Sequence, residues 1–197
     1  HTNLLTGSIP PLEGLSSLLL VDLYNNKLTG CIPSLRGLSS LKELYLNNNQ
    51  LSGTLPPLES LVSLQELSLF DNKLTGQLPV DFSVFPELTF FLAYNNDFVG
   101  TLSQTLFDLP LLESVMLSGN GKLGGSLPSV IDSPSLTFFV MEGCDLSGSL
   151  PTMISSNLTG LFLAGNRLES TIPKLPPTIM DVSLANNLLR GELADDF

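Results

Sequence analysis

Apolar and polar positions alternate along this chain in short blocks that return at nearly constant spacing. Residues 21–33 read V-D-L-Y-N-N-K-L-T-G-C-I-P, and the same order of residue types returns at residues 44–56 and 67–79. Each block starts with two apolar residues separated by one variable residue, which is the period-two pattern of a strand with one buried face. The blocks therefore predict short strands, each followed by a turn, and their recurrence predicts a stack of similar units.

A polar residue follows each predicted strand and marks the period of the repeat. Successive markers lie 21 to 24 residues apart along the chain. The markers are Asn3, Asn26, Asn49, Asn72, Asn96, Asn120, Cys144, Asn166 and Asn187. We therefore expect residues 1–197 to form a single domain of about nine repeats.

The repeat L-x-x-L-x-L-x-x-N/C-x-L, with its Thr/Ser-Gly-x-Ile/Leu-Pro tail, resembles the plant-type leucine-rich repeats. This resemblance covers essentially the whole chain and implies an α/β fold, a right-handed solenoid with a parallel β-sheet on its concave face. On the convex face it implies short 3₁₀ or helical turns and proline-containing segments. The paired cysteines common in the caps of the family are absent. Since a solenoid needs capped ends, we expect this chain to be a fragment of a longer protein.

The repeated polar and glycine positions have roles in stacking one turn on the next. The marker asparagine offers donors and acceptors to backbone groups of adjacent turns, which burial would otherwise leave unpaired. The glycine suits a sharp bend, and the proline fixes φ where no ladder hydrogen bond is needed. Two copies differ: Gly121 adds a residue after Asn120, and Glu169 with Ser170 replaces the expected Thr-Gly. We expect the curvature to change toward the C-terminal end.

Composition and charge exclude two classes of partner. The formal net charge is −11 with a pI near 4.2, which would repel a nucleic-acid backbone. The strongest apolar run, residues 18–21, ends at Asp22, far short of the roughly 20 residues that span a membrane. We therefore expect no nucleic-acid binding and no membrane insertion by this segment.

Catalysis and metal binding lack the residues that they require. The one histidine is His1, so a Ser-His-Asp or Cys-His arrangement has no usable base. Cys31 and Cys144 occupy repeat positions five turns apart, at roughly 4.8 Å per turn, which is too far for a disulfide. No cluster of His, Cys and carboxylates has the spacing of metal ligands. We expect no enzyme activity, no metal and no cofactor.

A glycosylation signal lies just before the predicted strand of the eighth repeat. Asn157, Leu158 and Thr159 form an N-x-[ST] sequon at a place where the chain should be accessible. We expect Asn157 to be glycosylated if the chain follows a secretory route. The family resemblance implies an extracellular or cell-surface location, with an organelle lumen as the alternative.

The candidate binding residues occupy the variable positions beside the strand leucines. These side chains alternate away from the core and should form columns across neighbouring strands. Contiguous exposed apolar surface marks interfaces, and aromatic residues are enriched at their energetic centres. A hydrophobic column comprises Leu92, Met116, Val140 and Phe162. An aromatic column comprises Tyr24, Tyr45, Phe70 and Tyr94. Phe90 and Phe138 extend the same face.

This face predicts a module that binds a protein or peptide partner. The resemblance to ectodomains of plant receptor kinases, receptor-like proteins and secreted inhibitors implies the same. The alternative is a structural subunit of a larger extracellular or organellar assembly, in which the face docks permanently. A second alternative assigns the outward aromatic residues to cross-strand packing alone. Phe91, Phe98 and Phe139 fall on core positions and are expected to be structural.

Overall fold

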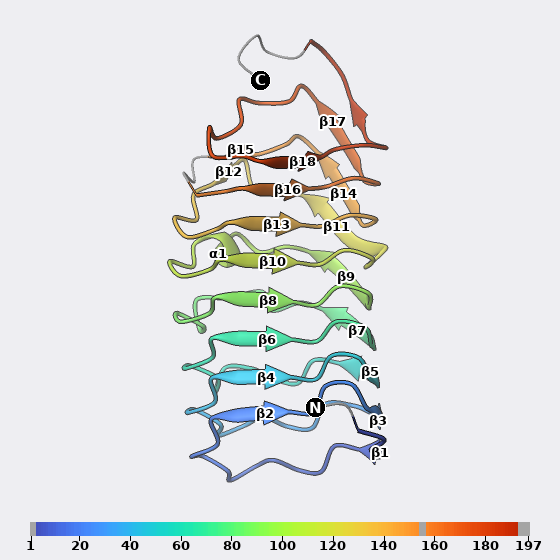
Figure 1. Cartoon of the computed structure of the whole chain (residues 1–197), viewed down its shortest axis with the longest axis vertical. Coiled ribbons are helices and arrows are strands. Elements are labelled where there is room, and N and C mark those ends of the chain that lie inside the picture. The colour runs from blue at the N-terminus through green and yellow to red at the C-terminus, as the bar shows by residue number, and fades with distance from the viewer. Residues whose placement is uncertain (1–2, 154–156, 193–197) are drawn as a thin grey trace.

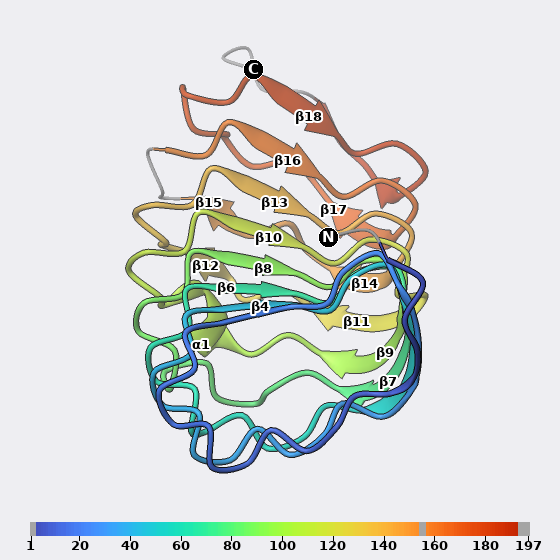
Figure 2. The same cartoon turned by 60° about the horizontal axis from the view of Figure 1, so that its bottom comes forward.

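The chain folds into a stack of coils with two parallel β-sheets along its length. The computed structural model describes residues 3–153 and 157–192. One sheet faces the viewer in Figure 1 and the other lies along the adjacent side. In Figure 2 the coils superpose around a common interior. The parallel-sheet solenoid predicted from the repeat is therefore confirmed.

Sheet I contains the strand that the alternating pattern predicts in each repeat. Its eight strands run parallel, and their middle residues stand in register, as for Val21, Leu44 and Leu67. These three residues are buried, so their side chains enter the common interior. The strands are β2 (Leu20–Asp22), β4 (Glu43–Tyr45), β6 (Glu66–Ser68), β8 (Phe90–Leu92), β10 (Ser114–Met116), β13 (Phe138–Val140), β16 (Gly160–Phe162) and β18 (Asp181–Ser183).

Sheet II is built from the Leu-Thr/Ser-Gly tails and was not predicted from the sequence. It has nine parallel strands, most of which begin directly after the marker residue of their repeat. Most of these segments offer one large apolar side chain, such as Leu28 or Leu51, so no period-two signal is visible in the sequence. The strands are β1 (Thr6–Ser8), β3 (Lys27–Gly30), β5 (Gln50–Thr54), β7 (Lys73–Gln77), β9 (Asp97–Thr101), β11 (Lys122–Ser126), β14 (Asp145–Gly148), β17 (Arg167–Ser170) and β19 (Leu188–Leu189).

The segments that close each coil are mostly isolated turns. Leu38 N donates to Leu35 O at 3.3 Å and Leu41 N donates to Leu38 O at 3.1 Å, which are the i to i+3 bonds of tight turns. Among the described residues, the one helix is α1 (Gln104–Phe107), whose N-cap Ser103 accepts a bond from the Thr105 amide. A short pair, β12 (Val130–Ile131) and β15 (Thr152–Met153), lies with α1 on the side away from sheet II (Figures 1 and 2).

The interior is one continuous hydrophobic cluster that extends from Ile9 to Leu168. Phe91, Phe98 and Phe139 are fully buried in it, which confirms their structural role. Phe139 contacts Phe107 of α1 edge to face, with ring centroids 5.3 Å apart. Because no turn could bury its own leucines alone, the stacking of turns supplies the stability of each one.

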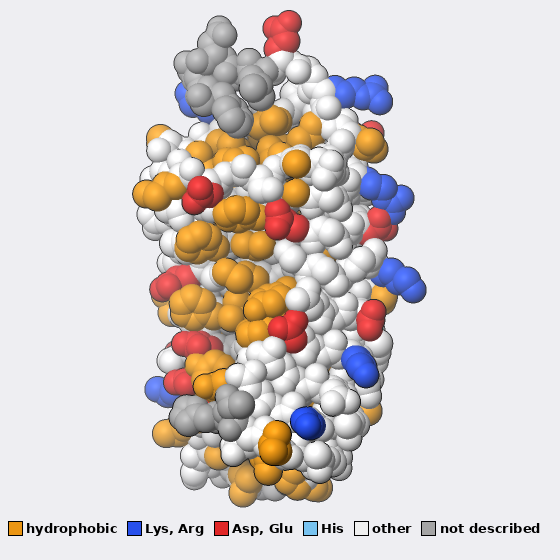
Figure 3. Space-filling view, turned by 45° about the vertical axis from the view of Figure 1, so that its right-hand side comes forward, with side chains coloured by type: hydrophobic (Ala, Val, Ile, Leu, Met, Phe, Trp, Pro, Cys, Tyr) orange, Lys and Arg blue, Asp and Glu red, His pale blue; other side chains and the backbone are white. Residues whose placement is uncertain are grey.

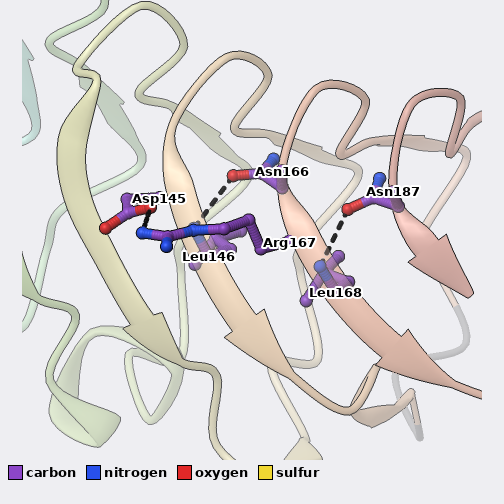
Figure 4. A network of polar contacts seen from close by, with 6 residues as sticks. All are labelled: Asp145, Leu146, Asn166, Arg167, Leu168 and Asn187. Atoms are coloured by element: carbon purple, nitrogen blue, oxygen red, sulfur yellow. Dashed lines mark hydrogen bonds and ion pairs between the residues drawn. The ribbon is translucent and has the colours of Figure 1, made fainter.

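The marker asparagines connect each turn to the turn before it. Asn49 Nδ2 donates to Leu23 O at 3.0 Å, and Asn49 Oδ1 accepts from Leu28 N at 3.0 Å. Figure 4 shows the same acceptor role for Asn166 toward Leu146 and for Asn187 toward Leu168. One side chain thus satisfies backbone groups that the solenoid would otherwise bury unpaired.

The repeat whose marker is a cysteine satisfies its backbone groups in a different way. Cys144 Sγ reaches Leu117 O at 3.4 Å but offers no oxygen to the amide of Leu123. That amide donates instead to the carbonyl of Asn120 at 2.9 Å. The extra residue, Gly121, lies between these two partners and makes this local bond sterically possible. The insertion and the cysteine therefore compensate for each other.

The glycine of the Thr/Ser-Gly tail is required for two reasons. Gly76 has φ +81°, and a Cβ there would lie 2.7 Å from Thr54 Cγ2 of the preceding turn. Glycine adopts this backbone conformation without strain and leaves that space free. Ser170 occupies the same position in a later repeat with φ 99°, which is a strained conformation for a residue with a side chain.

Candidate functional site

The outward residues of sheet I form three columns, which we call its outer face. The first and second columns come from the two ends of each strand, because partner strands stand in register. The third contains the second residue after each strand, aligned by bonds such as Asn48 N to Phe70 O. Hydrophobic side chains gather on this face in Figure 3, while most of the visible lysine and arginine side chains lie toward the right.

All ten candidate binding residues lie on the outer face. Phe138 is 38% exposed, and the other nine are half-buried. In the second column Leu92, Met116, Val140 and Phe162 are consecutive neighbours, as predicted. Phe90 and Phe138 belong to the first column, on either side of Ser114.

The predicted aromatic column is wrong in one member. Tyr45 stands in the second column, between Asp22 and Ser68. The third column reads Tyr24, Asn47, Phe70 and Tyr94, so an asparagine interrupts it. The error arose because Tyr45 ends its strand, whereas the other three aromatic residues follow theirs by two positions.

Two of the third-column aromatic rings pack against each other. Phe70 and Tyr94 are stacked, with ring centroids 4.3 Å apart and planes inclined by 10°. Burial raises the pKa of Tyr94, and the charge of Asp71 raises it further. These two side chains therefore have a packing role of their own, as the alternative interpretation of the aromatic residues requires.

Gly160 lets two phenylalanine rings come together at the C-terminal end of the face. A Cβ at Gly160 would lie 2.6 Å from Phe138 Cδ1 and 2.8 Å from Phe162 Cε2. The rings therefore occupy the space that any side chain at this position would need. Gly160 was not among the predicted binding residues, although a glycine in the first column is the sequence signal that could have indicated this arrangement.

Ser114 is a buried hydroxyl group beneath this apolar surface. It is 3% exposed and stands between Phe90 and Phe138 in the first column. Its Oγ is buried and has no hydrogen-bond partner in the structure. A buried hydroxyl without a partner is unusual in a folded protein and calls for an explanation.

The N-terminal part of the face is acidic. Glu43 and Glu66 stand directly opposite each other on neighbouring strands, and the Tyr45 hydroxyl donates to Glu66 Oε2 at 2.5 Å. Burial raises the pKa of Tyr45, and the nearby carboxylates of Glu66 and Glu43 raise it further. Among the described residues, neither glutamate forms an ion pair with a lysine or arginine.

The predicted glycosylation site is exposed on the surface. Asn157 Nδ2 donates to Pro134 O at 2.6 Å, and Thr159 Oγ1 donates to Thr137 O at 3.2 Å. Both bonds connect the sequon to the preceding turn. Asn157 lies in the turn before β16 and away from the outer face columns.

A hollow lies between the turn segments of adjacent repeats, away from the outer face. It has a volume of about 410 Å³ and is lined by apolar residues that include Pro57, Leu78, Val80 and Phe85. It forms where one turn segment passes over the next, and none of the candidate binding residues lines it.

Residues 3–153 and 157–192 hold neither a metal cluster nor a membrane-spanning helix. In these ranges no group of three or more His, Cys, Asp or Glu residues could hold a metal ion. Within the same part of the chain, no helix has the length and hydrophobicity needed to cross a bilayer. His1 lies outside the described residues.

Comparisons with known proteins agree with this architecture. A family model described as leucine-rich repeats (two copies) matches residues 39–80. The ectodomain of the receptor kinase SOBIR1 from Arabidopsis thaliana is 34% identical with a TM-score of 0.57, over 60% of this chain and 67% of that one. No curated protein sequence matches the chain.

Two further solved structures cover nearly the whole chain at 26% identity. A plant ice-binding protein has a TM-score of 0.80 over 96% of this chain. The plant peptide hormone receptor RGFR1, in complex with RGF2, has a TM-score of 0.64 over 95%. The chain spans 63% of the length of the first protein and 39% of the second.

Proposed function

We propose that this chain, which belongs to the plant-type leucine-rich-repeat proteins, is a recognition module that binds a protein or peptide through the outer face of sheet I. The observation that carries the proposal is the second column, where Leu92, Met116, Val140 and Phe162 form contiguous apolar surface in contact with solvent. Contiguous exposed apolar surface is costly to a monomer in water and usually marks an interface.

The similar structures support a binding role. RGFR1 is a peptide hormone receptor, and the SOBIR1 structure is the ectodomain of a receptor kinase. By analogy, we propose that the chain acts outside the cell, where Asn157 would carry a glycan. Treatment of the secreted protein with a glycosidase should reduce its mass, and Asn157→Gln should abolish that change.

A selection with random peptides tests the binding face. Peptides displayed in a library are enriched on the immobilised protein and then measured against Leu92→Asp combined with Phe162→Asp. Because two charges would be buried at the contact, we expect affinity to fall at least tenfold, on the order of 1.4 kcal/mol or more. Circular dichroism should show that the variant remains folded.

The matched control places the same charges on apolar residues elsewhere. Val62 and Leu111 are exposed in turn segments away from sheet I, so Val62→Asp with Leu111→Asp should leave peptide affinity unchanged. Binding that falls equally in both variants would contradict the proposal. So would a library that yields no binder, or binders indifferent to the sheet I variant.

Ice binding is a second candidate function, favoured by a different surface. On sheet II the residue after each tail glycine is exposed, and several of these residues carry hydroxyl groups, including Thr54, Thr101 and Ser126. Thr54 and Thr101 lie against Gly76 and Gly125 of the next turn, which fixes their positions. Gln77 interrupts the column.

Such a column repeats at the strand spacing of about 4.8 Å, and only a periodic surface can match a crystal over many contacts. The plant ice-binding protein shares the solenoid over 96% of this chain. Ice grown with the protein should form faceted crystals, and Thr54→Lys with Thr101→Lys should remove the effect. Unshaped crystals with the unmodified protein would eliminate this candidate.

A further inference from the structure

We propose that the partner of the outer face is an extended peptide with a cationic side chain at one end and apolar side chains about six residues away. This inference rests on the proposed function and specifies the chemistry of the partner. It is carried by the acidic and apolar parts of the face, by the distance between them and by the buried Ser114 hydroxyl.

The cationic side chain of the peptide lies between Glu43 and Glu66. These glutamates face each other on neighbouring strands, and like charges in that position destabilise a sheet. Among the described residues no lysine or arginine neutralises either one. A guanidinium group donates hydrogen bonds to both carboxylates through its fork of N–H groups. Tyr45 beside them is an aromatic residue of the kind that attracts cations.

The apolar side chains of the peptide cover Val140 and Phe162. The rings of Phe138 and Phe162 meet over Gly160 and form a smooth hydrophobic floor, which Leu92 and Met116 continue toward the acidic part. None of these residues carries a polar side chain. A peptide residue of leucine or phenylalanine type would bury the most apolar area there.

The buried Ser114 hydroxyl lies between the acidic and apolar parts. Its Oγ has no partner, although the residue is 3% exposed. A peptide crossing β10 brings backbone N–H and C=O groups over this position at each residue. A small movement of Phe90 or Phe138, which flank Ser114 in the first column, allows one of those groups to pair with the hydroxyl.

The strand spacing sets the length of the peptide. From the Glu43–Glu66 pair on β4 and β6 to Val140 and Phe162 on β13 and β16 there are four inter-strand steps, or roughly 19 Å. An extended chain advances about 3.3 to 3.6 Å per residue, so about six residues cover this distance. The net charge of −11 also attracts a cationic peptide over a longer range.

Designed peptides test the proposed chemistry directly. The probe is a fluorescent peptide in which arginine and a leucine–phenylalanine pair are separated by about five glycine and serine residues, the number that the span requires. We expect it to bind, and to bind at least tenfold more weakly when arginine becomes glutamate. Binding should also weaken at least tenfold when serine replaces both residues of the apolar pair, or when the arginine is placed next to that pair.

Variants of the protein locate each contact. Glu43→Gln with Glu66→Gln should weaken the arginine probe at least tenfold and should not weaken the glutamate version, because it removes the two carboxylates that repel that peptide. Glu59→Gln with Glu113→Gln removes the same charge from exposed positions outside sheet I and should change nothing. Ser114→Ala should weaken the probe roughly fivefold without lowering the thermal midpoint.

The outcomes separate this inference from the proposed function. The proposed peptide, with separate cationic and apolar parts, is wrong in either of two cases. In the first, both double glutamate variants weaken binding of the probe equally. In the second, the spacing between its arginine and its apolar pair has no effect on binding. If the designed probe fails to bind while library peptides still depend on Leu92 and Phe162, the face binds peptides of another chemistry. Library peptides that ignore those two residues would remove the proposed function itself.

Discussion

In the N-terminal half of the solenoid, from β2 to β7, the marker residues are asparagines and the outer face carries Glu43 and Glu66. In the C-terminal half, from β10 to β17, Cys144 and Ser170 replace expected residues. There the second column of the outer face is apolar, although Glu142 stands in the third. Both halves bury the same kind of leucine-rich interior. The comparison teaches that stacking determines the inward positions only, so that the outward positions were free to acquire different chemistry.

The irregular half also shows how a repeat tolerates change. Cys144 is accommodated because Gly121 gives the Leu123 amide a local acceptor, Asn120 O. The regular half contains no inserted residue that could do this. A departure from the repeat is therefore acceptable where a second departure nearby satisfies the same backbone group.

The largest expected effect comes from moving the cysteine into the regular half. Asn72 Oδ1 accepts from Leu51 N, and Asn72 Nδ2 donates to Leu46 O. Asn72→Cys leaves the amide unpaired in the interior, so the free energy of unfolding should fall by about 3 kcal/mol. Urea denaturation followed by circular dichroism measures it.

The corresponding control is Cys144→Ala, which removes only a weak thiol contact to Leu117 O. We expect it to cost about 1 kcal/mol or less. Equal losses of unfolding free energy in Asn72→Cys and Cys144→Ala would mean that the marker residue makes the same contribution in both halves.

A double-mutant cycle tests the compensation between Gly121 and Cys144. Deletion of Gly121 should cost about 2 kcal/mol, because the Leu123 amide then faces a thiol without an acceptor oxygen. Adding Cys144→Asn restores the acceptor and should recover about 1 kcal/mol of this loss. Additive effects of the two changes in denaturation experiments would show that the sites are independent.

Exchanging glycine and serine at the tail-glycine position should change the free energy of unfolding in opposite directions in the two halves. Ser170→Gly relieves a backbone with φ 99° and should stabilise the protein by about 1 kcal/mol. Gly76→Ser introduces the same strain and a contact with Thr54, so it should destabilise by about 2 kcal/mol. Thermal midpoints that move in the same direction would contradict this interpretation.

The smallest effect concerns the charge of the N-terminal half. Glu43→Gln removes the repulsion with Glu66 and should stabilise the fold by about 0.3 kcal/mol at low salt. The gain should disappear in concentrated salt, because screening weakens the repulsion in the unmodified protein. A gain that persists at high salt would point to a cause other than charge.

The same substitution should lower the pKa of Tyr45 toward its ordinary value of 10.0, because Glu43 is one of the groups that raise it. A raised folded-state pKa means that neutral Tyr45 stabilises the fold below pH 10.0. This contribution is lost as the pH rises through the folded-state pKa. Ultraviolet titration of the tyrosines measures the shift.

The sequence predicted the parts of this structure that recur in every repeat. The strands of sheet I and the buried phenylalanines followed from period and position. Sheet II did not, because strands such as Lys27–Gly30 contain one apolar residue and a glycine. The expected helical turns are mostly single turns because their segments are too short to continue a helix.

The candidate site was harder to predict because its chemistry depends on contacts across strands. Sequence order gave the second column correctly but placed Tyr45 among residues that lie two positions further on. The convergence of Tyr45 with Glu43 and Glu66 requires the register of β4 with β6. The unpaired Ser114 hydroxyl depends on the positions of neighbouring rings, which no periodic pattern encodes.

The marker asparagine has a consequence for synthesis, because it serves the turn made before its own. Leu28 N donates to Asn49 Oδ1, and Asn49 Nδ2 adds a second bond to Leu23 O beside that of Asn26. Asn49 leaves the ribosome after both of these residues. A coil emerging from the ribosome therefore remains incomplete until the following coil has arrived. Folding of this protein should therefore lag one repeat behind its translation. Each new coil should stabilise the coil made before it.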